Sequence, residues 1–377
     1  MAGAEGLRYG IVGAGYFGKE FARILAEVPG AELAAVLSPE DADDLVAESG
    51  GRVVDSIDEL IASVDAVIVA SPNHAHREPA IAAAEAGRHV FCEKPVALSY
   101  AECDAMVAAS EKAETLFLAG HILHFMPGIR RAADLIAAGA IGAPVFARTS
   151  RTGWEDGTAA PGWKKTRALS GGHLFHHIHE LDILQHLIGP AESVSMTGGA
   201  APQAGRRVGD EDAILLAAAT FAGGRYATLE WGSVFRRPEH TITVQGTEGY
   251  LAIDLQDVGV TLQRGGETET FPLHGSVEAD LERTRENRGA AGGSGVTYGD
   301  PARRPPRWLR AAMADEIAYF HGLATGARAV DPALAPLTDG SAARAAIATA
   351  EALTRALSLG RSVRVDEVTG GSLLDAA

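Results

Sequence analysis

The chain of 377 residues is poor in cysteine, in aromatic residues and in positive charge. Two cysteines, Cys92 and Cys103, are too few for a disulfide-stabilised secreted protein, and they favour a reducing cytoplasm. Lys and Arg together number 33 against 49 Asp and Glu, which gives a net charge of -16. Such an acidic surface repels a phosphate backbone, so we expect no nucleic-acid partner.

Long apolar runs and an N-terminal targeting pattern are also missing. No apolar run approaches the roughly 20 residues that a membrane-spanning helix needs, so we expect no membrane association. The start of the chain lacks the basic and apolar pattern of a secretion signal. With 46% hydrophobic residues, the chain is long enough to form two globular domains, each with its own core.

The most informative pattern that is present is a glycine-rich turn near the N-terminus. It follows an apolar strand at residues 8–12 and opens a helix. In such a G-x-G-x-x-G turn, the first glycine permits the bend, the second admits a pyrophosphate and the third lets the helix pack on the strand. The helix N-terminus then presents N–H groups and its positive dipole end to the anion. We therefore predict dinucleotide binding at Gly13, Gly15, Tyr16, Phe17 and Gly18.

Residues 7–122 alternate apolar strands with amphipathic helices, which is typical of a parallel sheet covered on both faces. Strands are predicted at 32–37, 65–70 and 89–92. The last two strands are followed by Ser71-Pro72-Asn73 and by Glu93-Lys94-Pro95. Because ligands of open parallel sheets bind outside the carboxyl ends of the strands, these two segments should line the cofactor crevice.

We predict that residues 1–122 form a nucleotide-binding domain. Beyond residue 122 the pattern changes, and we predict a second domain over 123–377. Strand patterns at 145–149, 213–221, 225–231, 240–245 and 249–254 predict a mainly antiparallel sheet with an open face. Gly223-Gly224 should form a hairpin turn. Residues 275–306 lack a periodic pattern and are predicted to be a flexible loop. The fold class is therefore α/β, a doubly wound parallel domain followed by an α+β domain.

The position that distinguishes NAD from NADP is Ser38, which lies about 20 residues after the glycine turn. An acidic residue there would accept hydrogen bonds from the adenosine ribose, whereas Ser38 leaves space for a 2′-phosphate. No Lys or Arg follows, and four carboxylates would repel that phosphate: Glu40, Asp41, Asp43 and Asp44. The sequence favours NAD, with NADP as the alternative.

Lys94 is a candidate catalytic residue because it comes directly after a buried strand. Pro95 fixes the turn, which could direct the ammonium group into the crevice. A cation there would stabilise an alkoxide that develops on a substrate giving hydride to nicotinamide. A solvated surface lysine is the alternative interpretation.

The segment from Ser170 to Asp182 holds four histidines and two carboxylates. If it is helical, His176, His179 and Asp182 share one face at three-residue spacing. A histidine held by a carboxylate is a competent general base near neutral pH. We favour this interpretation over a zinc site and over structural helix-end histidines, and we expect no metal because nicotinamide already supplies the electrophile.

Two further groups are candidates for substrate binding. His121 and His124 lie where the first domain passes into the second, and Trp163 and Lys165 lie on the loop before the histidine segment. An aromatic face beside a cation suits a carbohydrate ring that carries an acidic substituent. Ordinary hydrogen-bonded histidines and a solvated basic loop are the alternatives.

Over nearly its full length the chain resembles the Gfo/Idh/MocA (glucose-fructose oxidoreductase / inositol dehydrogenase) family. The matching segments are the glycine turn, Ser71-Pro72-Asn73 with His76, residues 86–90 leading into Glu93-Lys94-Pro95, residues 139–142, and the helix with His179 and Asp182. The resemblance implies a Rossmann domain and a C-terminal α/β domain whose open sheet builds homodimers or homotetramers. It also implies a nicotinamide cofactor and sugar or polyol substrates, with Lys94 and His179 in the reaction centre.

These considerations give two sets of predicted binding residues. The cofactor set adds the following to the glycine turn: Ser38, Ser71, Pro72, Asn73, His76, Glu93 and Lys94. The substrate set consists of His121, His124, Trp163, Lys165, His176 and His179.

The chain also departs from the family pattern. Phe175 stands where the dehydrogenases commonly carry an aspartate, four residues before the catalytic histidine. The extra histidines suggest the chemistry of relatives that keep NAD bound, oxidise a sugar carbon transiently, eliminate a glycosidic substituent, add water and reduce the ring again. His176, His177 and Glu180 could supply the additional acid and base groups for that sequence.

Our first functional hypothesis is an NAD-dependent oxidoreductase that oxidises a hydroxyl carbon of a sugar or polyol. His179, oriented by Asp182, removes the hydroxyl proton while Lys94 stabilises the alkoxide, with His176 as a further catalytic candidate. The alternative is an NAD-retaining redox glycosidase that acts on an acidic sugar glycoside. A sensor that binds NAD and a metabolite without turnover is disfavoured, since it needs no proton-transfer groups.

Overall fold

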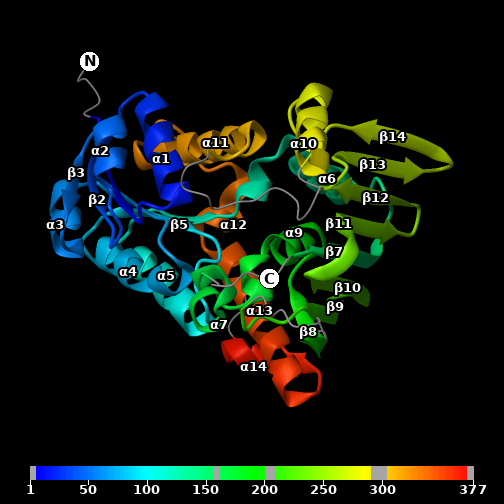
Figure 1. Cartoon of the computed structure of the whole chain (residues 1–377). Helices are drawn as coiled ribbons and strands as arrows, with labels where there is room; N and C mark the ends of the chain where they lie inside the picture. The colour runs from blue at the N-terminus through cyan, green and yellow to red at the C-terminus, as the bar shows by residue number, and fades with distance from the viewer. Residues whose placement is uncertain (1–5, 156–161, 201–208, 290–303, 372–377) are drawn as a thin grey trace. The chain divides into compact units, whose positions relative to one another are not determined.

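The computed structural model describes residues 6–155, 162–200, 209–289 and 304–371, which form two compact units (Figure 1). The first unit comprises Met1–Ala97, Ala101–Ile122 and Tyr298–Ala343. The second comprises Leu98–Tyr100, Leu123–Thr297 and Arg344–Ala377. The first unit therefore includes a segment from the C-terminal part of the chain, which the pattern of the first 122 residues does not reveal.

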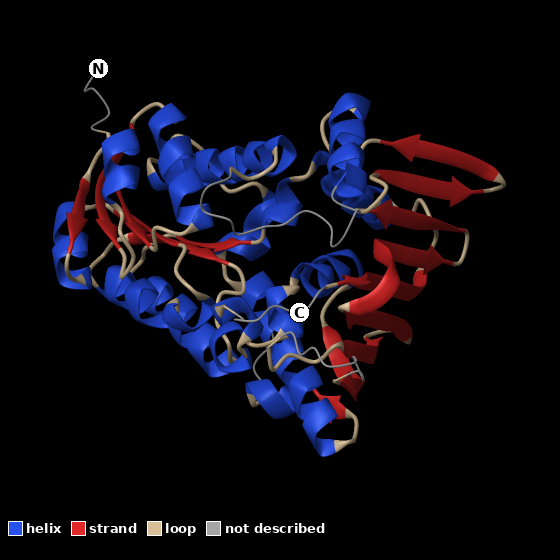
Figure 2. Cartoon of the chain, viewed as in Figure 1, coloured by secondary structure: helices blue, strands red, loops and turns tan. Residues whose placement is uncertain are grey.

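The first unit is built on six parallel strands in the order β3-β2-β1-β4-β5-β6, with helices on both faces (Figure 2). This confirms the doubly wound fold, and the strand order reverses between β1 and β4. Every residue of β4 is buried, as expected for a strand covered on both sides. The elements are β1 (Leu7–Val12), α1 (Tyr16–Glu27), β2 (Ala31–Leu37), α2 (Asp43–Ser49), β3 (Arg52–Val54), α3 (Ile57–Ser63), β4 (Ala66–Val69), η1 (Asn73–Ala75), α4 (Arg77–Glu85), β5 (His89–Glu93), α5 (Tyr100–Lys112), β6 (Phe117–Gly120), α11 (Arg307–Ala324), η5 (Pro332–Leu334) and α12 (Ala335–Thr338). The short helix η2 (Ile122–Phe125) begins in this unit and continues into the second.

The second unit is built on nine strands in the order β14-β13-β12-β11-β7-β10-β9-β8-β15. Strands β7 and β10 run parallel, and the other neighbouring pairs are antiparallel, which confirms a mainly antiparallel sheet. The elements are α6 (Pro127–Ala137), β7 (Pro144–Trp154), η3 (Trp163–Lys165), α7 (Arg167–Ser170), α8 (His173–His176), α9 (His179–Ile188), β8 (Ala191–Gly199), β9 (Ile214–Phe221), β10 (Arg225–Gly232), β11 (Val234–Gly246), β12 (Gly249–Asp254), β13 (Gly259–Arg264), β14 (Glu267–Phe271), α10 (Val277–Gly289), α13 (Ser341–Leu359), β15 (Val363–Arg364) and α14 (Asp366–Thr369).

One face of the nine-stranded sheet is open. Burial alternates along β9 and β10, so that every second side chain enters the core. On the opposite face Phe146, Leu216 and Tyr226 are 38%, 43% and 56% exposed. The predicted hairpin between β9 and β10 is confirmed, and Gly223 and Gly224 both have positive φ angles that suit glycine.

The flexible loop predicted over 275–306 is wrong for its first part, because residues 277–289 form helix α10. The helix is rich in charged residues, so its sequence shows no apolar periodicity from which a helix could be predicted. Asp280 is buried and accepts hydrogen bonds from the backbone N–H groups of Leu273 and His274, each at 2.8 Å. Arg283, one turn further along, is also buried and contacts His274. Residues 290–303 of the predicted loop lie outside the described residues.

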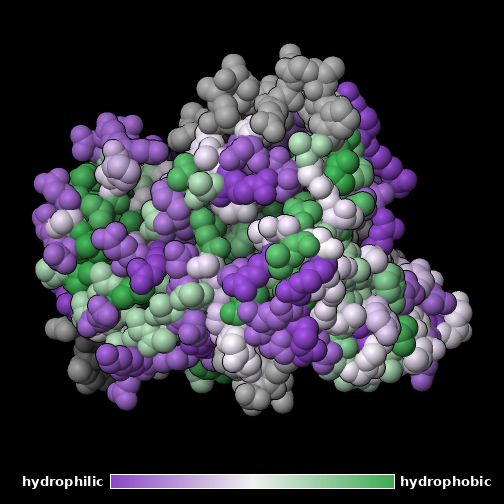
Figure 3. Space-filling view, turned by 90° about the horizontal axis from the view of Figure 1, so that it is seen from below, coloured by the Kyte–Doolittle hydropathy of each residue, from purple (hydrophilic) through white to green (hydrophobic). Residues whose placement is uncertain are grey.

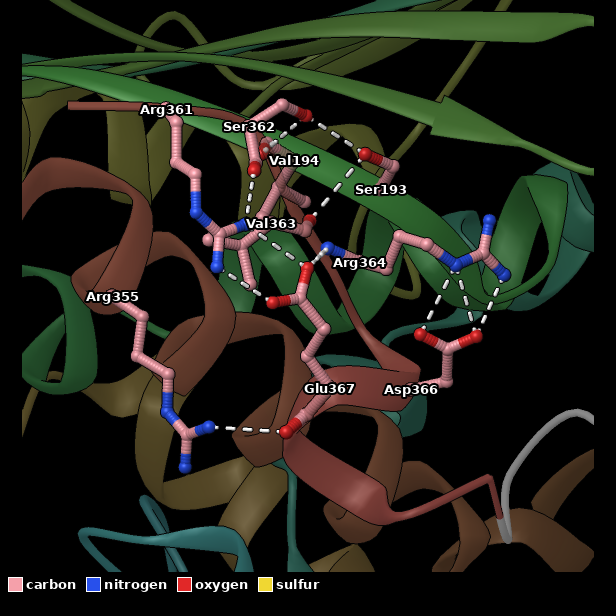
Figure 4. Close-up of polar contacts among 9 residues, drawn as sticks. All are labelled: Ser193, Val194, Arg355, Arg361, Ser362, Val363, Arg364, Asp366 and Glu367. Atoms are coloured by element: carbon pink, nitrogen blue, oxygen red, sulfur yellow. Dashed lines mark hydrogen bonds and ion pairs between the residues drawn. The ribbon is translucent and has the colours of Figure 1, made fainter. Parts of the chain in front are cut away.

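The C-terminal segment completes one edge of the second sheet (Figure 4). Strand β15 pairs with β8, and the hydroxyl groups of Ser193 and Ser362 lie 2.9 Å apart. The Glu367 carboxylate accepts hydrogen bonds from the Arg361 side chain and from the Arg364 backbone N–H. These contacts cover part of an edge strand that would otherwise expose unpaired backbone groups.

The surface is mixed in polarity, and in Figure 3 hydrophilic residues surround small groups of hydrophobic ones. Among the described residues, no helix combines the length and apolar character that crossing a membrane requires.

Candidate active site

The glycine turn has the geometry that a dinucleotide requires. Gly13 has a φ of +102°, and a Cβ there would lie 2.8 Å from the Ala70 carbonyl oxygen. A Cβ on Gly18 would lie 1.8 Å from the Gly13 carbonyl oxygen, so both positions exclude a side chain. Gly15, the N-cap of α1, has no described atom within 4 Å of an added Cβ. The open space at Gly15, next to the helix N-terminus, fits a pyrophosphate group.

The other residues of the turn begin helix α1. Tyr16 is buried and Phe17 packs edge-on against it, with ring centroids 5.1 Å apart. Ser38 follows β2 directly, and its hydroxyl oxygen accepts a hydrogen bond from the Glu40 backbone N–H at 3.1 Å. Ser38 therefore lies at the carboxyl end of the strand next to β1, where the sequence predicted contact with the adenosine ribose.

His76 connects the segments that follow β4 and β5. Its Nδ1 lies 3.0 Å from the Pro95 carbonyl oxygen, and its Nε2 lies 2.8 Å from the Ser71 carbonyl oxygen. Burial lowers the pKa of His76, so the ring is neutral and donates from one nitrogen at a time. His76 thus supports the two predicted cofactor segments, Ser71–Asn73 and Glu93–Pro95, through their backbone. Asn73 is buried at the start of η1.

Lys94 follows β5 directly and is half-buried, as is Glu93. The Glu93 carboxylate accepts a hydrogen bond from the Lys94 backbone N–H at 3.0 Å. Burial raises the pKa of Glu93 to about 7, although Lys94 and His121 oppose that shift. Lys94 therefore lies at the carboxyl end of a strand in the β4-β5-β6 half of the sheet, beyond the point where the strand order reverses.

The histidine segment is not the single helix that its spacing suggested. Helix α8 ends at His176, His177 leaves helical geometry with φ -109° and ψ 48°, and α9 begins at His179. The His177 carbonyl oxygen accepts a hydrogen bond from Trp231 Nε1 at 3.3 Å, which competes with a continuous helix. His176 therefore does not share the predicted face, because 3.6-residue periodicity does not extend across the break. His179 and Asp182 both lie in α9 and keep the predicted three-residue spacing.

Burial separates the histidines of this segment into two groups. His173 is 5% exposed, and its Nε2 has no hydrogen-bond partner among the described residues. His176, His177 and His179 are half-buried. The ring of His177 lies 4.5 Å from that of His173 and 4.9 Å from that of His176, measured between centroids. The three half-buried rings are the ones with access to a ligand.

Glu180 is a buried ion and not a proton donor. Its side chain is fully buried, its Oε1 lies 2.6 Å from His240 Nε2, and Arg151 Nη1 is 3.3 Å away. Burial alone would raise the pKa of Glu180, but His240 and Arg151 outweigh burial and hold the pKa below its usual value. An ionised carboxylate has no proton to donate, so an acid role of Glu180 loses its support, whereas a base role stays a prediction. The ionised carboxylate also interacts electrostatically with His179, where it favours the protonated imidazole.

Replacing Glu180 with alanine is expected to lower the free energy of unfolding by about 3 kcal/mol, because Arg151 and His240 would lose their buried partner. Urea unfolding followed by circular dichroism measures the loss. Glu278→Ala, which removes an exposed carboxylate from α10, is the matched control and should change stability by less than about 0.5 kcal/mol. Equal stability of the two variants would contradict a structural role for Glu180.

Asp182 has a histidine partner that the sequence did not suggest. His124 Nε2 lies 2.8 Å from the Asp182 carboxylate, and both side chains are 2% exposed. The His186 ring packs edge-on against His124 at 4.5 Å between centroids. The orientation of His179 by Asp182 stays a prediction, since the carboxylate is shared at least with His124. Both groups of the pair could also serve as metal ligands.

Lys165 lies between two carboxylates. Its Nζ is 2.6 Å from Glu155 and 3.1 Å from Glu211. The two carboxylates outweigh the charge of Lys165 and would repel an acidic substituent of a substrate. The arrangement therefore argues against Lys165 as the residue that binds such a substituent. Trp163, which opens η3, is half-buried with the Lys164 ammonium 5.8 Å from its ring centroid. Trp163 stays a candidate for binding a carbohydrate ring, because its side chain is half-buried and not fully enclosed.

Acid is expected to destabilise the second unit. Burial lowers the pKa values of His173, His186 and His274 to about 4, below the ordinary value of 6.5. The unfolded chain then binds more protons than the folded chain between about pH 6.5 and pH 4, so stability is complete above this window and falls as the pH drops through it. Melting temperatures should decrease steadily from pH 7 to pH 4.5. A constant melting temperature over this range would contradict neutral burial of these rings.

Sequence patterns did not identify Arg151 and His240, the partners of Glu180, as site residues. They are opposite one another on β7 and β11, 89 residues apart in the chain. Sequence patterns also missed Glu155 and Glu211, which surround Lys165. For Arg151 and His240 the one available signal was a polar residue in a strand, and the pairing of β7 with β11 brings them together. Glu155 and Glu211 lie in loops and gave no such signal.

Comparison with known proteins gives matches along almost the whole chain. Residues 7–121 match the family model described as "Oxidoreductase family, NAD-binding Rossmann fold", and residues 133–365 match "Oxidoreductase family, C-terminal alpha/beta domain". The chain is 46% identical to a 2,7-anhydro-N-acetylneuraminate hydratase of Mediterraneibacter gnavus, over 96% of this chain and 97% of that protein. It is 41% identical to a protein of the same name from Escherichia coli, over 96% and 98% of the two chains.

Among solved structures, aldose-aldose oxidoreductase from Caulobacter crescentus is similar at a TM-score of 0.73. The two chains are 25% identical, and the match covers 95% of this chain and 99% of the other. That structure is a complex with glycerol. The similarity extends over both units of the present fold.

Proposed function

The chain belongs to the Gfo/Idh/MocA family of NAD-binding oxidoreductases that act on sugars, and from this premise we propose that it hydrates 2,7-anhydro-N-acetylneuraminate. The observation that carries the proposal is the full-length similarity, 46% and 41%, to two hydratases of that compound. The cofactor is NAD. We therefore favour the redox glycosidase over the simple sugar dehydrogenase, the other hypothesis drawn from the sequence.

Hydration of an anhydro sugar needs no net oxidant, and NAD, which the turn at Gly13, Gly15 and Gly18 would hold, would supply a reversible hydride acceptor for a hydroxyl carbon. A reaction that uses a hydride acceptor but has no net oxidation requires that the sugar is oxidised only transiently. The hydroxyl carbon becomes a ketone, which acidifies the neighbouring C–H bond. Loss of that proton expels the bridging oxygen, which takes up a proton, and water then adds to the carbon–carbon double bond. Return of hydride and proton to the ketone leaves one added water as the net change.

Each step has a candidate residue in this chain. The Lys94 ammonium stabilises negative charge on the reacting hydroxyl oxygen. His179 takes the hydroxyl proton, and the buried Glu180 carboxylate stabilises the imidazolium that forms. His176 and His177 are half-buried and supply groups for the C–H proton and for the bridging oxygen. Because Glu180 is fixed by Arg151 and His240, it acts on His179 through charge alone.

The test is to incubate the protein with 2,7-anhydro-N-acetylneuraminate and an amount of NAD far below that of the substrate. We expect N-acetylneuraminate to form without net growth of NADH absorbance. In deuterated water the product should carry one solvent deuterium on the carbon next to the transient ketone. Growth of NADH in proportion to product would identify a simple dehydrogenase instead, and myo-inositol is the control substrate for that outcome.

The open face of the nine-stranded sheet supports a further part of the proposal, a homodimer or homotetramer in the cytoplasm. Phe146 and Tyr226 are opposite one another on β7 and β10, and Leu216 lies on the same face. An open hollow of about 710 Å³ lies there, between Arg148, Glu230 and Arg361. A second copy would cover these apolar side chains. Light scattering should give a multiple of the 39.2 kDa chain mass, and Tyr226→Glu should give the single mass.

A further inference from the structure

Lys164 is a half-buried lysine that the proposed reaction does not use. It is the middle residue of η3, between Trp163 and Lys165. Its ammonium group lies 5.8 Å from the centroid of the Trp163 ring, and no ion pair joins it to a carboxylate among the described residues. A half-buried ammonium group without an anionic partner is costly, because it loses part of its hydration and gains no opposite charge in return.

The electrostatics of the two adjacent lysines differ. Burial lowers the pKa of the Lys164 ammonium group, and the neighbouring Lys165 charge lowers it further. Burial also acts against the charge of Lys165, but Glu155 and Glu211 outweigh burial and raise its pKa. Lys165 therefore has its anionic partners within the protein, whereas Lys164 offers a positive charge to an anion from outside.

The other cations of the segment do not compete for such an anion. Residues 162–182 contain three lysine and arginine residues. Lys165 lies between two carboxylates, and Arg167 is paired with Asp212 at 3.0 Å. Lys164 is therefore the lysine or arginine of this segment that has no carboxylate partner among the described residues.

Helix η3 lies close to the histidine segment. It contacts α7, and α7 contacts α8. A Cβ on Gly172, the N-cap of α8, would lie 3.5 Å from Cγ of Arg167. The Lys165 charge acts on His173 of α8, whose ring centroid lies 4.5 Å from that of His177. The segment that carries the unpaired ammonium group therefore adjoins the candidate proton-transfer residues.

The proposed substrate carries the groups that such a segment would recognise. 2,7-Anhydro-N-acetylneuraminate is a sugar acid, with a carbohydrate ring and a carboxylate. The face of an indole packs against the C–H groups of a carbohydrate ring, and an ammonium group forms a strong, charge-assisted hydrogen bond to a carboxylate. A carboxylate beside Lys164 would also supply the negative charge that its half-buried position lacks.

We propose that Lys164 binds the carboxylate of the sugar acid and that Trp163 packs against its ring. The proposal rests on the proposed function for the identity of the sugar acid, and it replaces Lys165, the cation that the sequence predicted, by its neighbour. The carboxylate takes no part in the transient oxidation, so its contact with Lys164 is the same in the bound substrate and in the transition state. Lys164 therefore determines affinity and the selectivity for acids, and not the rate of the chemical steps.

Lys164→Met is the decisive variant, because methionine keeps an unbranched side chain beside Trp163 and removes the charge. With 2,7-anhydro-N-acetylneuraminate we expect KM to rise about 10²-fold and kcat to stay within about threefold of the wild type. The methyl ester of the substrate lacks the negative charge and serves as the second probe. The wild type should prefer the acid over the ester by about 10²-fold in kcat/KM, and Lys164→Met should prefer neither by more than about threefold.

Two further variants separate the lost charge from a damaged fold. Lys164→Arg keeps the positive charge and should retain a preference for the acid within about tenfold of the wild-type value. Lys112→Met, the same exchange as the decisive one but at an exposed lysine of α5, is the matched control and should leave the preference unchanged. Calorimetric titration of the NAD-loaded protein with N-acetylneuraminate measures the contact without turnover, and Lys164→Met should bind this acid about 10²-fold more weakly.

Two results would overturn the proposal. One is a folded Lys164→Met variant that keeps the wild-type preference for the acid over the ester. The other, which needs no variant, is a wild-type protein that accepts the methyl ester as readily as the acid. A chain that binds N-acetylneuraminate through Lys164 but leaves 2,7-anhydro-N-acetylneuraminate unreacted would refute the proposed function and not the carboxylate site.

Discussion

Replacing Lys94 with alanine is expected to lower kcat by about 10³-fold and to leave the affinity for NAD within a few fold of the wild type. The ammonium group is proposed to stabilise the charge that develops on the substrate oxygen when hydride leaves. That charge exists in the transition state and not in the bound substrate, so the loss should fall on kcat more than on KM. The cofactor turn at Gly13, Gly15 and Gly18 does not depend on this side chain.

The rate is measured in a single turnover, in which the reduction of the cofactor by substrate is monitored through the absorbance of the reduced nicotinamide. Lys112→Ala, which removes an exposed lysine at the end of α5, is the matched control and should keep the wild-type rate. Calorimetric titration of NAD shows whether the cofactor site is intact. A Lys94→Ala variant that keeps its rate within tenfold would remove Lys94 from the reaction centre.

Replacing His179 with alanine is expected to lower kcat by about 10²–10⁴-fold, the range that a positioned proton-transfer group contributes. His179 is the first residue of α9, where the helix dipole disfavours a positive imidazolium. The Glu180 carboxylate, buried and held by Arg151 and His240, offsets that effect. The sugar hydroxyl should then bind normally, but its proton should have no acceptor.

Chemical rescue distinguishes a lost base from a damaged fold. Added imidazole should restore part of the turnover of His179→Ala in proportion to its concentration, since it can occupy the vacated space and accept the proton. It should not help Lys94→Ala, which lacks a positive charge instead. Unchanged melting temperature together with absent rescue and a near-normal rate would show that another group removes the hydroxyl proton.

Local patterns in the chain were sufficient to predict the parallel sheet and the glycine turn of the first unit, but not the addition of α11 to it. The glycine turn needs a positive φ at Gly13 and leaves no room for a Cβ at Gly18, and the strands next to it are apolar runs. Both signals lie within about 30 residues, the length of one strand-helix-strand unit. The positions of Lys94 and of the Ser71–Asn73 segment then follow from the rule that ligands bind at the carboxyl ends of parallel strands.

The histidine segment shows where local patterns fail. Helical spacing placed His176, His179 and Asp182 together, but a hydrogen bond from Trp231, 54 residues away, helps to end the helix at this point. Asp182 pairs with His124, and Glu180 pairs with residues of β7 and β11. None of these contacts has a signal in the immediate sequence, because each joins segments that are distant along the chain.

The amino-acid order by itself determined a parallel nucleotide-binding fold, its glycine turn and the identities of the candidate lysine and histidines, because backbone conformation and periodic burial are properties of short segments. Tertiary packing alone decided which buried carboxyl groups have charged partners and which have none among the described residues. Glu180 and Glu316 are both buried glutamates in helices, yet Glu180 is paired with Arg151 and His240, whereas the Glu316 carboxyl group has no hydrogen-bond partner among the described residues. Charge states of this kind depend on desolvation and on neighbours from distant segments, and only the folded chain brings those together.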